Sequence, residues 1–351
     1  MEKDIHPEIT LDLVRVTEAA ALMSSLFLGF GDKEKVDKAA VDAMRGMLDY
    51  IDIKGTVVIG EGEKDEAPML FNGEKVGNWK ETALEMDIAV DPIDGTRLVA
   101  YGLPNAIASM VFAEKGKMMS IPTFYCNKLA VGPELKGKLD INKSLTENVK
   151  LAAEALNLPI TEITVVMLNR ERHRSYIEEI RKIGARIKLI SDGDIAGAIA
   201  TSMPESGVDI AYGIGGSPEG ILAAAALRTL GGEIQMKLWP RDEQEKIKVK
   251  DWDLNKVYFT KDLVGGEHVI FSATGVTDGD FLKGVKFIKG KAITDTIAMR
   301  TSSATIRRIV TQHDLNKKTI RLKSIDGDEN IFQVDLKHPK NSNALLKNKF
   351  I

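Results

Sequence analysis

Two aspartates and a threonine lie close together in the segment Asp91-Pro-Ile-Asp94-Gly-Thr96. The apolar residues before Asp91 predict a short strand, and Pro92 is expected to end it because proline has no backbone N–H. Gly95 permits the unusual backbone angles of the turn that follows. Carboxylates and a hydroxyl on a tight turn suit a hard divalent cation such as Mg²⁺ or Mn²⁺. An ordinary turn with a helix cap at Asp94 is the alternative interpretation of this segment alone.

A second acidic segment follows another predicted strand. Residues 56–60 have strand character and lead through Gly60 into Glu61-Gly-Glu-Lys-Asp65-Glu. Charged runs of this kind usually form solvated loops. This run, however, leaves an apolar strand as the segment at Asp91 does, so carboxylates from two strand ends could share one cation or two.

Lys33 and Asp37 add two more charged groups. They are four residues apart on a predicted helix that starts after Asp32, a good N-cap residue. Side chains at this spacing share one side of a helix. A surface ion pair is the simpler interpretation of this helix taken by itself.

The predicted elements alternate between strands and helices from residue 163 onwards. Strands at 163–168, 186–190 and 208–212 each precede a helix, an order that implies parallel strands with right-handed crossovers. Ligands of such sheets bind at the carboxyl ends of the strands. The loops at those ends contain Arg170, Glu171 and Arg172, then Asp192, Gly193 and Asp194, then Gly216 and Glu219.

Each of these loops also has a purely structural interpretation. Arginines are typical of solvated loops, His173 fits a helix start or a packing position, and Asp192 and Asp194 fit a turn and a helix cap. Ser217-Pro-Glu219 is a well-formed helix start. The glycines ahead of it leave amide groups that could receive a phosphate or sugar oxygen.

Several common catalytic motifs are missing from the sequence. Pro218 stands where the dinucleotide fingerprint G-x-G-x-x-G requires glycine, and neither a G-x-x-x-x-G-K-S/T loop nor a G-x-S-x-G elbow occurs. Cations that neutralise phosphate and acidify a water, with arginines that hold a distal anion, are the parts that phosphoester hydrolysis needs. The residues therefore predict a metal-dependent phosphatase, whose candidate carboxylates are Asp37, Glu61, Asp65, Asp91, Asp94 and Glu219.

The composition is that of an ordinary globular protein. The chain has 351 residues, 44% of them hydrophobic and 28% charged, and a net charge of -3. This length favours two domains or one large layered domain, and the charge offers no basic surface for nucleic acid or a membrane. Cys126 is the only cysteine, so no intrachain disulfide can form. No segment reaches the ~18 apolar residues of a membrane helix, and we expect a cytoplasmic protein.

Long motifs occur in a specific order along the chain: Gly31-Asp-Lys33, residues 60–69, residues 91–96, Ser191-Asp-Gly-Asp194, residues 212–220 and Phe271-Ser-Ala-Thr-Gly275. Together they resemble the class II bacterial fructose-1,6-bisphosphatases, within the lithium-sensitive phosphatase superfamily. The resemblance runs from about residue 14 to residue 312. It implies an α/β fold, a layered α/β/α/β/α sandwich of the sugar-phosphatase type. We expect an α+β metal-binding half at 1–158, a doubly wound α/β substrate-binding half at 159–312, and a polar Lys-rich C-terminal tail at 313–351.

The resemblance also implies roles for individual residues. Thr96, with Asp65 behind it, falls where the attacking water is oriented, and Lys33 falls beside the phosphate that leaves. The two arginines, Arg170 and Arg172, would serve the phosphate that stays. The metal positions, for Mg²⁺ or Mn²⁺, are Asp37, Glu61, Asp91, Asp94 and Glu219. The substrate-contacting positions are Gly95, Thr96, Tyr125, Arg170, Glu171, Arg172, Asp192, Gly193, Asp194 and Gly216.

Two positions depart from the pattern of the family. Many class II members have Glu where Asp94 stands, which leaves the number and distance of the metals open. Arg170 replaces a frequent Lys, which keeps the charge and alters the geometry.

The expected reaction is hydrolysis of D-fructose 1,6-bisphosphate to D-fructose 6-phosphate and phosphate, and some relatives also accept sedoheptulose 1,7-bisphosphate. An inositol-phosphate or nucleotide-3'-phosphate phosphatase on the same metal loop is an alternative, although the two arginines favour a substrate with a second phosphate. A non-catalytic sugar-phosphate sensor and a nucleotide-dependent oxidoreductase also stay open. We expect a homo-oligomer, either a dimer or a tetramer, with a small-molecule substrate and no nucleic-acid or membrane partner.

Overall fold

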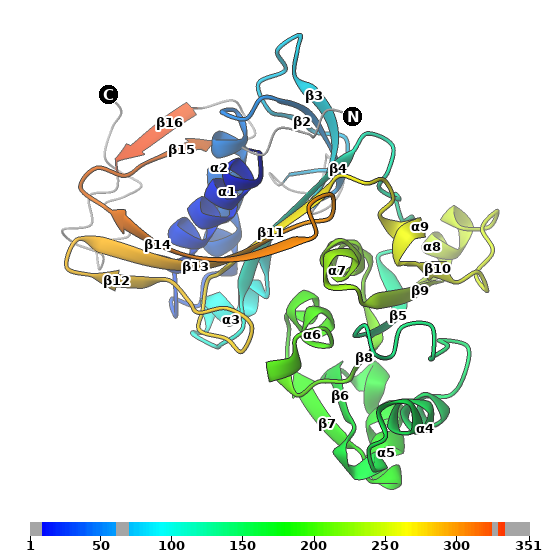
Figure 1. Ribbon diagram of the computed structural model, residues 1–351. Helices are drawn as coiled ribbons and strands as arrows, with labels where there is room; N and C mark the ends of the chain where they lie inside the picture. Colours follow the sequence, from blue (N-terminus) through cyan, green and yellow to red (C-terminus); the bar gives the residue numbers. More distant parts are fainter. Residues whose placement is uncertain (1–8, 61–69, 325–328, 334–351) are drawn as a thin grey trace. The chain divides into compact units, whose positions relative to one another are not determined.

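The computed structural model describes residues 9–60, 70–324 and 329–333 (Figure 1). The chain divides into two compact units, of which unit 1 comprises Met1–Gly116 with Glu267–Ile351 and unit 2 comprises Lys117–Gly266. These limits differ from the expected boundary near residue 158. The difference arises because a strand before residue 116 is hydrogen-bonded along its length to a strand after residue 267.

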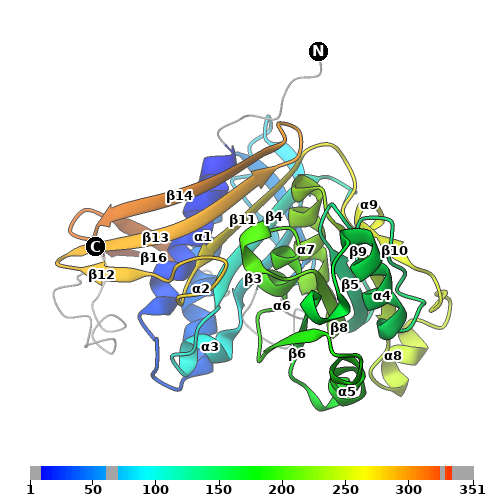
Figure 2. The ribbon, with the colours of Figure 1, turned by 60° about the horizontal axis from the view of Figure 1, so that its bottom comes forward.

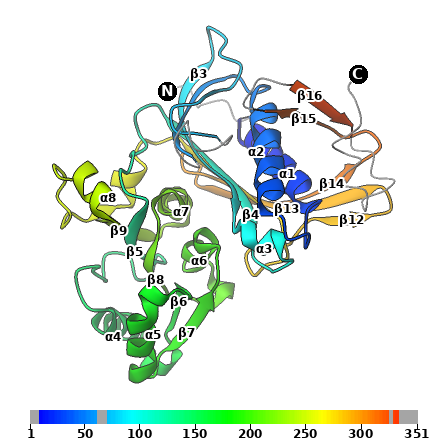
Figure 3. The ribbon, with the colours of Figure 1, turned by 180° about the vertical axis from the view of Figure 1, so that it is seen from behind.

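Unit 1 contains an eight-stranded sheet that is covered on one face by two helices (Figures 1 and 3). The helices are α1 (Ile9–Ser25), which is buried along most of its length, and α2 (Lys33–Leu48), whose buried residues recur at helical spacing. The side chain of Asp32 accepts the N–H of Lys35 and caps α2, as predicted. The strands follow the order β12 (Lys286–Ile288), β13 (Lys291–Arg300), β11 (Val269–Gly275), β4 (Ile107–Glu114), β3 (Leu84–Asp94), β1 (Ile53–Ile59) and β2 (Lys75–Val76), with β14 (Thr305–Asp314) paired to β13.

β3 continues through Pro92, so the prediction that the strand ends there is wrong. The pairing of β3 with β4 shifts register between Asp91 and Asp94. A proline is tolerated at such an irregularity because the missing N–H has no ladder bond to make there. Gly95 has a φ of +93°, which favours glycine, and α3 (Thr96–Ala100) begins directly after it. The acidic loop is therefore a distorted strand end that turns at once into a helix.

Part of the segment expected to be a polar tail belongs to the core of unit 1. β15 (Thr319–Lys323) pairs antiparallel with β16 (Glu329–Gln333) on the side of α2 away from the sheet (Figures 1 and 3). Ile320 and Leu322 are buried within the same apolar cluster as α1 and α2. Alternating apolar residues thus outweigh the lysine-rich composition of this stretch.

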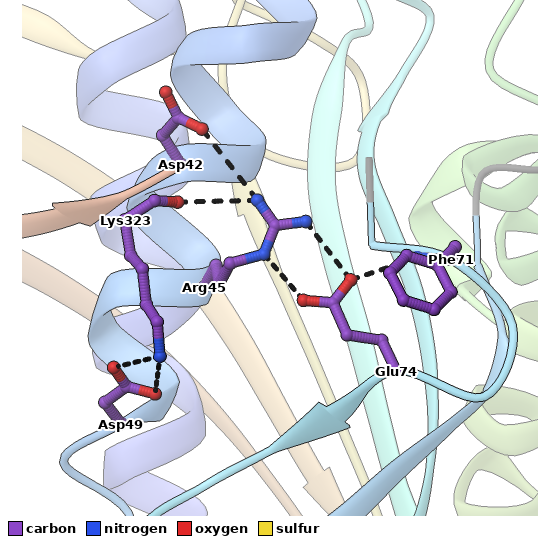
Figure 4. A network of polar contacts seen from close by, with 6 residues as sticks. All are labelled: Asp42, Arg45, Asp49, Phe71, Glu74 and Lys323. Atoms are coloured by element: carbon purple, nitrogen blue, oxygen red, sulfur yellow. Dashed lines mark hydrogen bonds and ion pairs between the residues drawn. The ribbon is translucent and has the colours of Figure 1, made fainter. Parts of the chain in front are cut away.

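A buried charged network holds β15 against α2 (Figure 4). Arg45 of α2 donates to both carboxylate oxygens of Glu74, at 2.6 and 3.1 Å, and to the backbone oxygen of Lys323 at 3.4 Å. The ammonium of Lys323 in turn lies 2.9 Å from Asp49 at the end of α2. Glu74 also accepts the backbone N–H of Phe71. One guanidinium therefore links three segments that are distant in sequence.

Unit 2 contains a six-stranded sheet with helices on both faces (Figures 1 and 2). Its order is β10 (Tyr258–Phe259), β9 (Glu233–Trp239), β5 (Tyr125–Val131), β8 (Ile210–Gly216), β6 (Thr164–Leu168) and β7 (Arg186–Ile190). As predicted, β6 is parallel to β7 and β8, whereas β5 is antiparallel to β8 and β9.

The helices of unit 2 fall into two layers. α4 (Leu145–Leu156) and α5 (Arg174–Ile183) cover one face of the sheet, and α6 (Asp194–Ala200) and α7 (Ser217–Leu230) cover the other (Figure 2). Shorter elements complete the unit: α8 (Glu243–Lys248), α9 (Thr260–Leu263) and single turns at Ile160–Glu162, Glu171–His173 and Pro204–Ser206. Each unit is thus a layered α/β structure, which confirms the predicted class. Within the described ranges, no helix combines the length and the apolar character that crossing a membrane requires.

Candidate active site

Three of the predicted metal ligands lie at the end of β3 and on the first turns of α2: Asp91 and Asp94 on β3, and Asp37 on α2. Asp91 and Asp94 are only 7% and 5% exposed. The hydroxyl of Thr96 donates to Oδ1 of Asp37 at 2.5 Å, which joins the first turn of α3 to α2. Burial raises the pKa of Asp37 to about 6, although the hydrogen bond from Thr96 and the charge of Lys33 act to lower it. The structure therefore brings Lys33, Asp37 and Thr96 to the strand end that carries the two buried aspartates.

Glu61 and Asp65 lie outside the described residues. Gly60, the last described residue before them, donates its N–H to the side chain of Asn72 at 2.8 Å. Gly73 likewise donates to the carbonyl of Val57 at 2.7 Å. The two described flanks of the acidic run are therefore hydrogen-bonded to each other at the end of β1.

The loops of unit 2 that were predicted to meet at one edge of its sheet do so. Arg170, after β6, lies 2.5 Å from Asp192, after β7. Arg172 donates twice to the carbonyl of Ile214 on β8, at 3.1 and 2.9 Å, and its guanidinium stacks 4.7 Å from the ring of Tyr125 on β5. Residues at the ends of four strands thus contribute to a single cluster that contains the guanidinium groups of Arg170 and Arg172.

Other predicted substrate residues frame this cluster. Gly193 caps the N-terminus of α6 with a left-handed backbone. Gly216 ends β8 and pairs directly with Tyr125. Glu171 is exposed in the turn before α5, where it faces Arg174 at 3.5 Å, so it contributes charge at the rim of the cluster and no buried contact.

Glu219 lies in the first turn of α7, where the positive end of the helix favours an anion. Its Oε2 atom is buried and has no hydrogen-bond partner among the residues that the structure describes. Burial raises the pKa of Glu219 to about 7, helped by the negative charge of Asp194 and opposed by the ammonium of Lys128. A buried carboxylate oxygen without a partner suits a hard cation.

The predicted metal ligands are distributed over the two units. Asp37, Asp91 and Asp94 belong to unit 1, Glu219 belongs to unit 2, and Glu61 lies outside the described residues. Within residues 9–60 and 70–324, no three acidic, histidine or cysteine side chains converge as a metal site would require. The metal set therefore stays a prediction, although the buried carboxylates present in each unit fit Mg²⁺ or Mn²⁺ in ligand type.

His173 has a structural role in unit 2. Its ring is buried, with Nδ1 2.7 Å from the carbonyl of Leu168 and Nε2 2.8 Å from the N–H of Ile214. The ring must accept at Nε2 and donate at Nδ1, so it is neutral, and burial lowers its pKa. His173 therefore fixes the loop after β6 to β8, in agreement with the packing interpretation.

Sequence reasoning missed Lys128. Its ammonium lies 2.5 Å from Asp194 and 3.0 Å from the carbonyl of Gly216. The signal in the sequence was a lysine within a strand whose next three residues, 129–131, are apolar. A charge at such a position needs a buried partner.

Comparisons with known proteins agree with this architecture. The family model described as "Bacterial fructose-1,6-bisphosphatase, glpX-encoded" matches residues 7–313. The chain is 44% identical over 326 residues to Fructose-1,6-bisphosphatase 1 class 2 of Escherichia coli (strain K12). The aligned region covers 89% of this chain and 96% of that protein. The class 2 enzymes of Escherichia coli O6:H1 and Shigella flexneri give the same identity and coverage.

The layered α/β units and their acidic and cationic strand ends are those of a sugar-phosphatase fold. The chain belongs to the bacterial fructose-1,6-bisphosphatase family, class II, whose members are phosphoric monoester hydrolases that depend on a metal ion and act on a sugar bisphosphate. The resemblance inferred from the sequence motifs is thereby confirmed.

Proposed function

We propose that the protein hydrolyses D-fructose 1,6-bisphosphate to D-fructose 6-phosphate and phosphate with Mg²⁺ or Mn²⁺. The observation that carries the proposal is the cluster of Arg170, Arg172 and Tyr125 at the carboxyl edge of the unit 2 sheet. A doubly phosphorylated sugar needs positively charged groups for the phosphate that is not cleaved, and arginine guanidinium groups bind phosphate oxygens in pairs. Membership of the family supports the same reaction.

We assign the metal to Asp37, Glu61, Asp91, Asp94 and Glu219. When bound, the metal ion would neutralise the scissile phosphate and acidify a water. Thr96 would orient that water, because its hydroxyl hydrogen is engaged by Asp37 and its oxygen lone pairs can therefore accept a hydrogen bond from the water. Asp65 would support the same step, and Lys33 would interact with the leaving phosphate. All of these groups except Glu61 and Asp65 lie in the described parts of the chain.

The substrate would be held mainly by unit 2. Each arginine has N–H donors besides those that bind Asp192 or Ile214, so each can also hold phosphate oxygens. Tyr125 lies beneath the guanidinium of Arg172 and fixes its plane. Gly95, Thr96, Glu171, Asp192, Gly193, Asp194 and Gly216 would supply the remaining contacts to the sugar and its phosphates.

Phosphate release from a panel of substrates tests the proposal. The panel contains fructose 1,6-bisphosphate, sedoheptulose 1,7-bisphosphate, inositol monophosphates and a nucleoside 3'-phosphate, with Mg²⁺, Mn²⁺ and Li⁺ varied. We expect preference for the fructose bisphosphate and no turnover in EDTA. Preference for an inositol or nucleoside phosphate would refute the substrate, and binding of the bisphosphate without phosphate release would indicate a sensor.

Asp91→Ala and Glu61→Ala test the metal assignment. Each should abolish turnover while the circular dichroism spectrum stays that of the unchanged protein, because a lost carboxylate ligand cannot be replaced by a methyl group. Asp52→Ala, at an exposed position of unit 1, is the matched control and should retain full activity. Near-normal activity of Asp91→Ala would refute the assignment.

We also propose a homo-oligomer, a dimer or a tetramer, in the cytoplasm. The exposed apolar side chains Ile306 and Val310 on β14 support association, and a single buried cysteine suits a reducing compartment. Sedimentation velocity tests the assembly, and a monomer at micromolar concentration would contradict it.

A further inference from the structure

Lys128 is a charged residue in the interior of unit 2 to which the sequence-based prediction gives no role. It lies in the middle of β5, and its side chain is only 12% exposed. The next residues along the strand, Leu129 and Ala130, are buried. Removing an ammonium from water is unfavourable unless the charge is paired. The partners of Lys128 therefore indicate what it does.

The ammonium of Lys128 joins two loops that were predicted to contact the substrate. Its Nζ atom lies 2.5 Å from Oδ2 of Asp194, the first residue of α6, and donates at 3.0 Å to the carbonyl of Gly216, the last residue of β8. Gly215 leaves the space for this pair. A Cβ atom at that position would lie 2.2 Å from Oδ2 of Asp194 and 2.7 Å from Nζ of Lys128. A side chain at position 215 would therefore displace the ion pair between Lys128 and Asp194.

This arrangement affects the charge of the binding site. Asp194 is a carboxylate whose side chain is 18% exposed, and the substrate that we propose it contacts is itself an anion. Without a positive neighbour it would repel the substrate. Lys128 offsets that charge and leaves the outer lone pairs of the carboxylate available to sugar hydroxyls.

The same arrangement affects the backbone. The hydrogen bond from Lys128 to Gly216 fixes the peptide plane that joins β8 to Ser217, and α7 begins at Ser217. The start of α7 carries Glu219, so the same ammonium orients the loop before the proposed metal ligand.

We infer that Lys128 is a positioning residue for substrate binding: it holds the Asp194 carboxylate and the Gly216 carbonyl in the arrangement that receives the sugar bisphosphate. The inference rests on the proposed substrate contacts of Asp194 and Gly216. The competing interpretation is a buried ion pair that only stabilises unit 2. Such a pair would affect the Tm of the protein and leave its substrate affinity unchanged.

Substrate affinity of Lys128→Met tests the inference on the full chain. Calorimetry in EDTA measures the Kd of D-fructose 1,6-bisphosphate without metal, and steady-state kinetics with Mg²⁺ measures KM and kcat. We expect Kd and KM to rise by about tenfold or more while kcat falls by less than about threefold, since the residue acts on binding. Lys237→Met is the matched control, because Lys237 lies on the adjacent strand β9 and its ammonium donates to the surface residue Asn142. Its Kd should stay within about twofold of the unchanged protein.

If Lys128→Met has a Kd and a KM within about twofold of those of the unchanged protein, the inference is overturned, even if the Tm of the variant is lower. The variant Asp194→Asn extends the test. In that background the further change Lys128→Met should raise Kd by a smaller factor than it does in the unchanged protein, because only the Gly216 carbonyl is left for Lys128 to hold. An equal loss in both backgrounds would also overturn the inference.

The doubly substituted protein covers the case in which Lys128→Met alone does not fold, because it neutralises the Asp194 carboxylate together with the cation that pairs with it. The binding comparison is also separate from the proposed reaction. If the unchanged protein binds the bisphosphate and releases no phosphate, the reaction is refuted and the Kd values still decide the role of Lys128. If the unchanged protein does not bind the bisphosphate, both proposals are refuted.

Discussion

Replacing Arg45 by Met removes the centre of the network that joins α2, β15 and the segment before β2. The side chains of Arg45 and Glu74 are 4% and 12% exposed, so the change leaves a buried carboxylate without its cation. Breaking a buried ion pair from one side costs about 3–5 kcal/mol. Glu74 keeps the N–H of Phe71 and some contact with water, so we expect the lower end, about 3 kcal/mol off the free energy of unfolding of unit 1.

Urea denaturation monitored by Trp79 measures this loss. Trp79 is in unit 1, whereas Trp239 and Trp252 are in unit 2, so a Trp239→Phe, Trp252→Phe background reports on unit 1 alone. Lys35→Met is the control on the same helix, because the Lys35–Asp32 pair is exposed and should contribute little to stability.

The double replacement Arg45→Met, Glu74→Met separates two explanations of the effect. If the unpaired charge is the cause, the double variant is more stable than Arg45→Met alone, since apolar residues of similar volume can replace a buried ion pair at little cost. A loss below about 1 kcal/mol in Arg45→Met would show that the network contributes no more than a surface pair, and would refute the reasoning.

Three further outcomes are expected. Thr96→Val should lower kcat by about 100-fold or more with KM little changed, because the attacking water loses the oxygen that orients it. Thr96→Ser keeps that oxygen and should retain most of the activity. Equal kcat values in the two variants would contradict the role of Thr96. Arg172→Gln should raise KM for the bisphosphate by about 100-fold, because the paired hydrogen bonds to the phosphate are lost. Arg174→Gln, on the exposed face of α5, should leave KM unchanged. Phosphate-release kinetics of the two variants measures both values. Burial lowers the pKa of His313 from 6.5 to about 4. As the pH falls from about 6.5 to about 4, this histidine is therefore protonated in the unfolded chain and stays neutral in the folded protein. The free energy of unfolding should therefore decrease by up to about 3 kcal/mol between pH 7 and pH 4, and His313→Gln should remove this part of the decrease; parallel profiles of the two proteins would refute it.

Elements set by local patterns were predictable from the sequence. The alternation that defines β6, α5, β7, α6, β8 and α7 lies in hydrophobic spacing and in residues at the helix starts, and the structure follows it closely. Asp32 caps α2 for the same local reason. The convergence of Arg170, Arg172 and Asp192 was also predictable, because parallel strands bring their carboxyl ends to one edge.

Features set by distant partners were not predictable in this way. Pro92 is accommodated in β3 only because the pairing with β4 is irregular there. β15 is ordered because Ile320 and Leu322 pack on α2, far away in sequence. Lys128 was overlooked because its partner, Asp194, is on another strand-end loop. The metal and substrate assignments stay predictions, with Glu61 and Asp65 outside the described residues.

The two-segment construction of unit 1 has a consequence for synthesis on the ribosome. β4 pairs with β11 along its length, from Ile107 opposite Gly275 to Ala113 opposite Val269. One edge of β4 therefore has no partner strand until residue 275 has emerged from the ribosome. Unit 2, which is continuous in sequence, can meanwhile acquire its whole sheet. During that interval the nascent chain would display an open apolar strand edge, a known starting point for aggregation. Chaperone dependence or slow translation in the region encoding unit 2 would accordingly act on the yield of unit 1.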